Sequence, residues 1–376
     1  MNLHPCVKEK ADEAVRLRRA LHRIPELSLE EYKTSQFVQE HLGALRPDAM
    51  QVIAGTGVKA VFDAGAEKTI AIRADIDALP LEERTGLPFA SQNPGCMHAC
   101  GHDGHMAAAL GFAQIVAAKR KDLKTNFVFL FQPAEETTGG AERMIAEGAL
   151  DCPHVDEIYG IHLWPGLPEG KVALKAGPLM ANMCDVNVRM QGKTAHGAAP
   201  HLGTDALLAA AHFVVAAQGI LTRNVSPLEP AVLNIGRITA GDARNIVCGQ
   251  ALVEGTVRSF SDELSEEIRG RVREIMAGID RAFGTKSEYY ETMGYPALVN
   301  SVKLYEKAAG LFAEPEWIPA QPVMMSEDFA YFTRAREGLF AFIGAGEGSL
   351  HSNTFDFNEE CLSSALEFYV RVCGIE

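Results

Sequence analysis

Short runs of consecutive apolar residues recur through the first half of the chain, with helical patterns between them. The runs are Gly57–Phe62, Thr69–Ala74, Asn126–Gln132 and Glu157–Leu163. Apolar residues recur at helical spacing in Met106–Lys119, and Ala11–Leu42 is typical of a helix broken at Pro25. A later run, Phe340–Gly344, precedes a final helical segment, Glu359–Val372. Strands buried on both faces are apolar almost throughout, so this order predicts an α/β fold with a mainly parallel sheet and helices on both faces.

Residues 183–293 follow a different pattern, in which half-buried strands and helices come in the order β-α-β-β-α-β. The predicted strands are Met183–Met190, Ala231–Ile238, Gln250–Phe260 and Glu288–Met293, and the predicted helices are Thr204–Thr222 and Asp262–Phe283. Thr204 is the expected N-cap of the first helix, because its hydroxyl can accept a backbone hydrogen bond there. The order is that of a ferredoxin-like α+β unit. We therefore expect a second domain at residues 178–294, inserted into a discontinuous larger domain at residues 1–177 and 295–376.

Charge and composition narrow the class of protein. The 376 residues contain 35 Lys and Arg against 49 Asp and Glu, a formal net charge of −14. Such a surface repels nucleic acid and anionic lipid, so neither is an expected partner. The polar segment Met1–Glu13 has no apolar signal sequence, and the runs Met106–Ala118 and Ala206–Leu221 are shorter than an expected membrane span. These features predict a cytoplasmic protein.

The densest group of reactive side chains lies in the segment Gly95–His105, just before a predicted helix. It contains Cys96, His98, Cys100, His102, Asp103 and His105. Thiols and imidazoles are the ligands that zinc-like ions prefer. A redox pair is the alternative, but the spacing of Cys96 and Cys100 is not that of a thioredoxin-type motif. The segment therefore predicts metal binding.

Further ligand-type side chains follow the predicted strands. Asp75 and Asp77 come after one strand, Glu135 and Glu136 after another, and His162 ends a third, while His351 follows Phe340–Gly344. Each of these residues alone is more often a solvated charge or a core histidine. However, open α/β sheets bind ligands beyond the carboxyl ends of their strands. Four strand ends carrying such residues therefore predict one site at this edge of the sheet.

Seven segments, in order over nearly the whole chain, resemble the M20 metallopeptidase family. They are Arg73–Pro80, Gly95–Ala107, Phe131–Glu136, Gly160–Pro165, Gly192–Ala206, Ser326–Phe332 and Leu350–Glu360. They are most similar to its amidohydrolase branch, which includes hippurate hydrolases, N-acyl-amino-acid hydrolases, auxin-conjugate hydrolases and N-acetyldiaminopimelate deacetylases. The resemblance implies a catalytic α/β domain with an inserted ferredoxin-like lid, through which such proteins often form homodimers.

The resemblance also implies a role for individual residues. The ligands of a two-metal site would be Cys100, His102, Glu136, His162 and His351, with the Cys100 thiolate between the two ions. Glu135 would be the general base and Asp77 would orient a ligand. His98, Asp103 and His105 are not made ligands and are expected to support the site.

Two residues of the middle region are implied as well. His196 would donate a hydrogen bond to the transition state, and Asn245 would contact substrate. Without the resemblance, His196 would be read as a surface imidazole. Near Asn245, Ala240 and Cys248 depart from the residues common in the family, which affects the expected substrate contacts.

The expected activity is hydrolysis of the N-acyl amide bond of a small N-acyl amino acid or amino-acid conjugate. Two divalent ions, Zn²⁺ first and otherwise Mn²⁺, Co²⁺ or Ni²⁺, would activate a water whose proton Glu135 accepts. One alternative is a dipeptidase or carboxypeptidase of the M20 family. Another, from a different class, is a metal-binding protein without catalysis, although the spare carboxylate of Glu135 argues against it.

Overall fold

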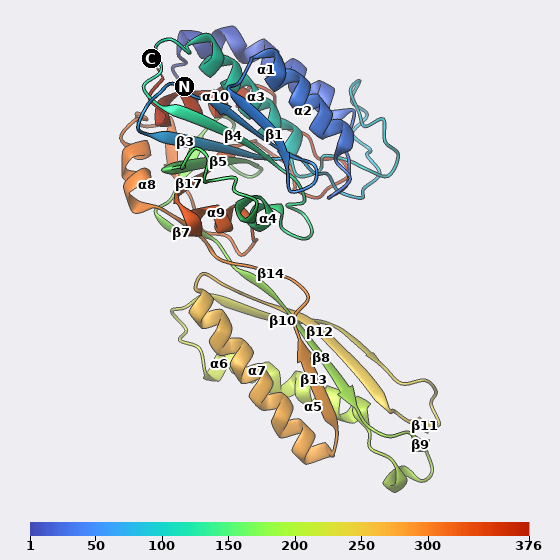
Figure 1. Ribbon diagram of the computed structural model, residues 1–376. Helices are drawn as coiled ribbons and strands as arrows, with labels where there is room; N and C mark the ends of the chain where they lie inside the picture. Colours follow the sequence, from blue (N-terminus) through green and yellow to red (C-terminus); the bar gives the residue numbers. More distant parts are fainter. Residues whose placement is uncertain (376) are drawn as a thin grey trace. The chain divides into compact units, whose positions relative to one another are not determined.

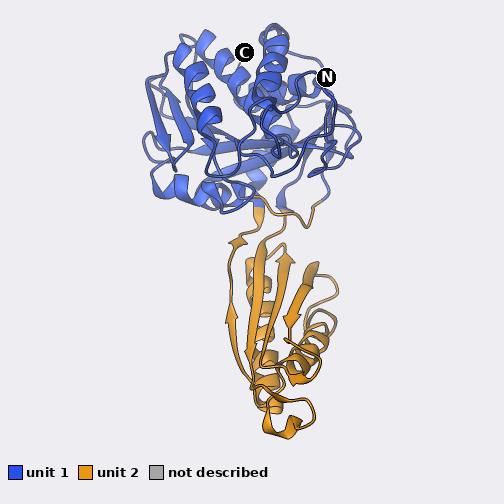
Figure 2. Ribbon diagram, turned by 90° about the vertical axis from the view of Figure 1, so that its right-hand side faces the viewer, with its two compact units in different colours: residues 1–179, 299–321, 328–376 blue, residues 180–298, 322–327 orange. Residues whose placement is uncertain are grey.

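The computed structural model describes residues 1–375, which divide into two compact units (Figure 2). Unit 1 is discontinuous and comprises residues 1–179, 299–321 and the chain from Asp328 onward. Unit 2 comprises Met180–Leu298 and Pro322–Glu327. The division of the chain into domains at 177/178 and 294/295, and the role of the second domain as a lid, stay predictions.

An eight-stranded sheet forms the centre of unit 1, in the order β1-β2-β4-β3-β5-β17-β6-β16 (Figure 1). Its strands are β1 (Ala49–Ile53), β2 (Gly57–Phe62), β3 (Thr69–Asp75), β4 (Asn126–Gln132), β5 (Glu157–Trp164), β6 (Val172–Leu174), β16 (Trp317–Pro319) and β17 (Glu337–Gly344). The central strands β4, β3, β5 and β17 are parallel, whereas β1, β2 and β6 make antiparallel pairs. The predicted α/β class with a mainly parallel sheet is confirmed, because the apolar runs are strands buried on both faces.

Helices cover both faces of this sheet (Figure 1). One face carries α1 (Pro5–His22), α2 (Tyr32–Ala44), α3 (His102–Ala118) and α10 (Cys361–Val372), and the other carries α4 (Gly140–Ala146) and α9 (Phe329–Ala335). A further helix, α8 (Val302–Ala309), contacts β17, and the short strands β7 (Gly177–Met180) and β15 (Leu298–Asn300) pair with each other. Helix α3 packs between the sheet and the helices α1 and α10, so nearly all its side chains are buried. This burial explains why its sequence is apolar almost throughout. The chain leaves the helix conformation between His22 and Tyr32, around Pro25, as predicted.

Unit 2 contains an antiparallel sheet in the order β10-β12-β8-β13, with helices against it. Its strands are β8 (Met183–Gln191), β9 (Ala195–His196), β10 (Ala231–Ala240), β11 (Ile246–Val247), β12 (Gln250–Ser259), β13 (Lys286–Tyr290) and β14 (Gly294–Tyr295). The helices are α5 (Ala206–Ala217), α6 (Gly219–Arg223) and α7 (Asp262–Phe283), with a 3-10 turn at Pro200–Leu202. Strands and helices thus follow one another in the β-α-β-β-α-β order of a ferredoxin-like unit.

Two local predictions in unit 2 were wrong. The N-cap of α5 is Asp205, not Thr204: one Asp205 carboxylate oxygen accepts from the backbone N–H groups of Leu207 and Leu208. A carboxylate one residue closer to the helix reaches both donors, so the Thr204 hydroxyl is not needed. The strand expected at Glu288–Met293 runs from Lys286 to Tyr290 instead.

The apolar stretch at α5 and α6 is longer than the sequence suggested. Residues 206–223 form an 18-residue stretch of mean hydropathy 1.4, which is long and apolar enough to cross a membrane by length and composition alone. On one side of α5, Ala209, Phe213 and Ala217 are fully buried in the core of unit 2. Packing inside unit 2 therefore accounts for this part of the apolar pattern.

Candidate metal centre

Six of the predicted site residues lie together in unit 1, near the carboxyl ends of β4 and β5. Their donor atoms form three overlapping triads, each with all atoms within 4.8 Å of one another: Cys100, His102 and His162; Cys100, Glu136 and His351; and His102, Glu135 and Glu136. Cys100, His102 and Glu136 each belong to two of these triads. This sharing brings all six side chains into one cluster, as expected from the position of their strand ends.

Local structure delivers the residues of the 95–105 segment to this cluster. His102 is the first residue of α3, and Gly101 before it has a φ of +88°, a left-handed conformation that a glycine adopts without strain. The turn at Gly101 thus places Cys100 and His102 on the same side of the segment. Gly104 also lies close to the side chain of Leu163, because a Cβ there would be only 2.4 Å from its Cδ1 atom.

Hydrogen bonds at the Nδ1 atoms orient two of the imidazoles. The Nδ1 of His102 is 2.9 Å from the carbonyl oxygen of Asp77, and the Nδ1 of His162 is 2.8 Å from the carbonyl oxygen of Leu163. A carbonyl oxygen can only accept, so in the neutral form of each ring Nδ1 carries the proton and Nε2 keeps a lone pair that can bind metal. The Nε2 of His162 lies 3.4 Å from the Cys100 sulfur.

Two buried donor atoms in the cluster fit a metal ion. The Nε2 of His102 and the Oε1 of Glu136 lie 3.8 Å apart, and neither makes a hydrogen bond within residues 1–375. The same Oε1 is 3.3 Å from the Nε2 of His351. Burying polar atoms without a well-formed hydrogen bond costs free energy, and metal coordination would recover part of it. The donor set of thiolate, imidazole and carboxylate is that of a zinc-like ion.

The carboxylate of Asp77 contacts both His102 and the backbone of Glu136. Its Oδ1 is 3.3 Å from the Nδ1 of His102, while its Oδ2 accepts from the backbone N–H of Glu136 at 2.9 Å. The hydroxyl of Ser28 donates to the same Oδ2 at 2.7 Å. That Asp77 orients a metal-ligating histidine stays a prediction.

The electrostatics of the cluster also favour a cation. Burial, and after it the carboxylates of Glu136 and Glu135, raise the pKa of Cys100 well above its ordinary value. Burial opposes protonation of His102, but Asp75 and Asp77 raise its pKa to about 10. A bound divalent ion would reverse both effects, because it stabilises the thiolate and competes with the imidazole proton.

The expected supporting residues are all buried. The Nδ1 of His105 donates to Asp75 at 2.7 Å, and its Nε2 accepts from the backbone N–H of Leu163 at 2.9 Å. Asp103 forms an ion pair with Arg18. His98 is fully buried, neither of its ring nitrogens has a hydrogen-bond partner among the described residues, and burial lowers its pKa to about 4. That these three residues support the site without binding metal stays a prediction.

His196 and Asn245 lie in unit 2, next to each other. His196 pairs with Ile246 across β9 and β11, and Gly197 donates its N–H to the Asn245 carbonyl oxygen at 2.7 Å. The backbone N–H of Ala198 donates to Nδ1 of His196 at 3.1 Å. A neutral His196 therefore carries its proton on Nε2, the form that can donate to an oxyanion.

Three residues around the cluster were not predicted from the sequence: Arg18, Ser28 and Glu31. Arg18 had a detectable signal, since it stands among Ala14, Leu17 and Leu21 on the buried side of α1. A charged residue on the apolar side of a helix usually has a buried partner. Ser28 and Glu31 carry no comparable signal, because their partners are distant in the sequence.

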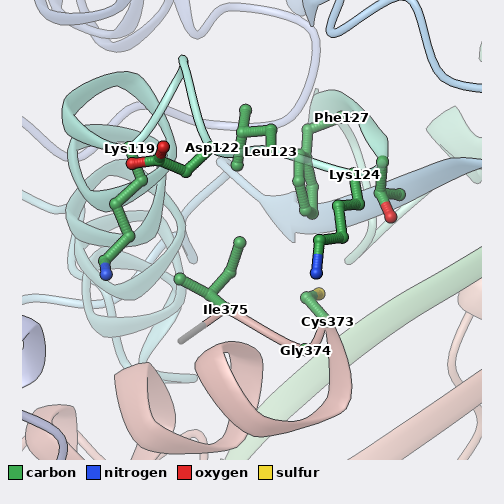
Figure 3. Close-up of a pocket in the computed structure, with 9 residues that line it drawn as sticks. Lys119, Asp122, Leu123, Lys124, Phe127, Cys373, Gly374 and Ile375 are labelled. Carbon is green, nitrogen blue, oxygen red and sulfur yellow. The ribbon is translucent and has the colours of Figure 1, made fainter.

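A separate hollow of about 390 Å³ lies near the amino end of β4 (Figure 3). The metal cluster lies near the carboxyl end of the same strand. Figure 3 shows Lys119, Lys124, Phe127, Cys373 and Ile375 around it. None of the predicted site residues lines it. The hollow is therefore not part of the metal centre.

Comparisons with known proteins agree with this centre. Residues 71–374 match Peptidase family M20/M25/M40. The chain is 40% identical to an N-acetyl-L-cysteine deacetylase of Bacillus subtilis, over 94% of this chain and 85% of that protein. It is 38% identical to an N-acetyldiaminopimelate deacetylase of the same species, over 95% and 96% of the two chains.

A solved structure has the same fold. The YXEP protein of Bacillus subtilis, a dinuclear metal-binding peptidase of the M20 family, is 32% identical, covers 98% of each chain and superposes with a TM-score of 0.86. Its two metals accord with the overlapping donor triads described above. The family match, the identities and the shared fold show that this chain belongs to the M20 peptidase family, in its amidohydrolase branch.

Proposed function

We propose that this protein is a metal-dependent hydrolase that cleaves the amide bond of small N-acyl amino acids or amino-acid conjugates. The observation that carries the proposal is the adjacent pair Glu135 and Glu136, whose oxygens lie within 4.8 Å of a His102 nitrogen. One carboxylate can bind metal while the other acts as a base. The deacetylase names of two relatives support an N-acyl amino acid as the substrate class.

The donor atoms support two divalent ions in each subunit. Cys100, His102, Glu136, His162 and His351 would hold them. Zn²⁺ is the first choice for a thiolate and imidazole set, and Mn²⁺, Co²⁺ or Ni²⁺ also suit it. When bound, the ions would polarise the amide carbonyl and lower the pKa of the attacking water.

The chain's own residues would carry the proton and hold the substrate. Glu135 accepts the proton of the attacking water and passes it to the departing nitrogen. Asp77 keeps His102 in the orientation in which Nε2 faces the site. The Nε2–H of His196 would donate to the tetrahedral oxyanion, and Asn245 would contact the substrate.

We also propose the setting in which the enzyme works. The net charge of −14 disfavours nucleic acid and anionic membranes as partners, and we place the protein in the cytoplasm as part of the proposal. A homodimer formed through unit 2 stays part of the proposal, and size-exclusion chromatography with light scattering would test it.

Replacing Glu135 by Gln tests the proposed base. Glu135→Gln should lower kcat by at least ~10²-fold, because the amide cannot accept a proton, while metal content stays near that of the wild type. Glu142→Gln is the matched control, since Glu142 is an exposed carboxylate in the first turn of α4. Full activity of Glu135→Gln would contradict the assignment.

A substrate panel separates the proposed activity from its alternatives. The panel contains N-acetyl-cysteine, N-acetyldiaminopimelate, N-benzoylglycine (hippurate) and several dipeptides, each with added Zn²⁺, Mn²⁺, Co²⁺ or Ni²⁺. Faster cleavage of dipeptides would favour an M20-type dipeptidase or carboxypeptidase. Metal binding without hydrolysis of any compound would favour a metal-binding protein that lacks catalysis.

A further inference from the structure

The guanidinium of Arg18, on α1 in unit 1, is buried, and each of its three nitrogens donates a hydrogen bond. Its side chain is 1% exposed. Its Nε donates to Oδ2 of Asp103 at 3.0 Å, its Nη2 to Oδ1 of Asp356 at 2.5 Å, and its Nη1 to Oε1 of Glu359 at 3.2 Å. Arg18 is thus bonded to three carboxylates at once.

Two aromatic rings complete the surroundings of this guanidinium. The Cζ of Arg18 lies 4.1 Å from the ring centroid of Phe357 and 5.0 Å from that of Phe89. Aromatic faces attract a cation and restrict its orientation. The position of the guanidinium plane is therefore set by five neighbours.

The three carboxylates belong to the two segments that carry His102 and His351. Asp103 directly follows His102 at the start of α3, and Asp356 and Glu359 lie in the loop after His351. The backbone N–H of His351 also donates to the carbonyl oxygen of Ala99 at 2.9 Å. Arg18 therefore connects two segments that are far apart in the sequence and meet at the metal centre.

Stability alone does not require such an arrangement. Taking an ion from water costs free energy, and apolar side chains of similar volume often give an equally stable protein. Such an arrangement can instead fix the positions of metal ligands, since residues behind a metal site commonly change metal affinity by ~10–100-fold when they are replaced.

We propose that Arg18 is a positioning residue for the metal centre. It holds the start of α3 and the loop after His351 at a fixed separation, so that His102 and His351 reach their ions together. This inference rests on the proposed two-metal site, and it concerns how the protein holds its ligands.

Calorimetric titration of the metal-free protein with Zn²⁺ tests the proposal. Arg18→Met should weaken binding of both ions by ~10-fold or more. Arg18→Lys should recover part of the affinity, because an ammonium retains the charge but cannot reach all three carboxylates. Arg19→Met is the matched control: Arg19 is the next residue on α1, is 48% exposed and also pairs with Glu359, and its loss should change affinity less than twofold.

A second variant removes only the ion pair between Arg18 and Asp356, in the loop after His351. Asp356 is 36% exposed, so Asp356→Asn is expected to fold, and thermal unfolding would verify this. This variant should weaken binding of the ion held by Cys100, Glu136 and His351 more than binding of the other ion. With Co²⁺ as the probe, the absorption bands of only one of the two bound ions should change.

The outcomes separate this inference from the proposed function. If the wild type binds no Zn²⁺ or Co²⁺, the two-metal proposal fails and the inference fails with it. If the wild type binds two ions and both Arg18→Met and Asp356→Asn bind them with wild-type affinity, only the positioning role is overturned. If Arg18→Met does not fold, Arg18→Lys and Asp356→Asn decide by the same criterion.

Discussion

Ala134, directly before the proposed base, has a left-handed backbone with a φ of 55°. This conformation costs a residue with a Cβ atom about 1–2 kcal/mol, so neighbouring groups must hold it. The Oε1 of the buried Glu31 accepts from the N–H of Ala134 at 2.9 Å, and its Oε2 accepts from the hydroxyl of Thr56 at 2.5 Å. Glu31 thus stabilises the backbone from which Glu135 and Glu136 project.

Glu31→Gln should therefore impair catalysis without touching the metal ligands. One of the two accepted hydrogen bonds is lost, at a cost of about 1–3 kcal/mol, and the loop carrying Glu135 relaxes. We expect kcat to fall by ~10-fold while KM changes little. Steady-state kinetics with Glu30→Gln, an exposed neighbour, as the control would measure this. Equal kcat values for the two variants would show that Glu31 does not position the base.

At the scale of elements, the loop after β4 is held by close backbone contacts. A Cβ atom on Gly140, the first residue of α4, would lie 1.8 Å from the carbonyl oxygen of Pro133. Gly139 donates its N–H to the Ala134 carbonyl oxygen at 3.0 Å. The start of α4 therefore packs directly against the loop that carries Glu135.

Gly140→Ala should displace this loop. Because the clash is with backbone, we expect a loss of about 1–3 kcal/mol in the free energy of unfolding, together with reduced activity. The matched control is Gly278→Ala in α7, where an added Cβ meets nothing within 4 Å. That change should leave stability the same or raise it by up to ~1 kcal/mol. Similar thermal shifts in both variants would argue against the close contact.

At the scale of elements, the strands could be predicted from the sequence, whereas the contacts between distant segments could not. The buried strands β2 to β5 are recognisable because their apolar runs are local, and the strand ends then bring Glu136 and His162 together. The contacts that fix these ligands are not local. Arg18 meets Asp103 across 85 residues and Asp356 across 338, and no periodicity encodes such distances. The same limit applies to Glu31, whose partner Ala134 is 103 residues away.

The whole molecule consists of two units with separate hydrophobic cores. The proposed metal ligands all lie in unit 1, whereas the core of unit 2 is built from residues such as Phe213, Val253 and Val272. A ligand that binds only the folded form stabilises the part of the molecule to which it binds. The metal ions should therefore stabilise one unit and not the other.

Scanning calorimetry with and without EDTA should reveal this difference. Removal of the metal is expected to lower the unfolding temperature of the unit 1 transition by about 5–15 °C and to leave the other transition in place. Val272→Ala identifies the second transition, because it removes a fully buried side chain from the core of unit 2 at a cost of ~2 kcal/mol. If EDTA shifts the transition that Val272→Ala shifts, the ions do not bind where we propose.

The strand order of unit 1 has a consequence for synthesis of the protein. β17 lies between β5 and β6 in the sheet, yet it is made only after all of unit 2, including the segment Pro322–Glu327, has been translated. A growing chain on the ribosome thus carries β5 with one edge unpaired until residues 337–344 emerge, and His351 follows later still. An unpaired strand edge is a site for aggregation. The proposed ligand His351 is thus made after the last strand, so the metal centre can be fully loaded only when all eight strands of the sheet have been synthesised.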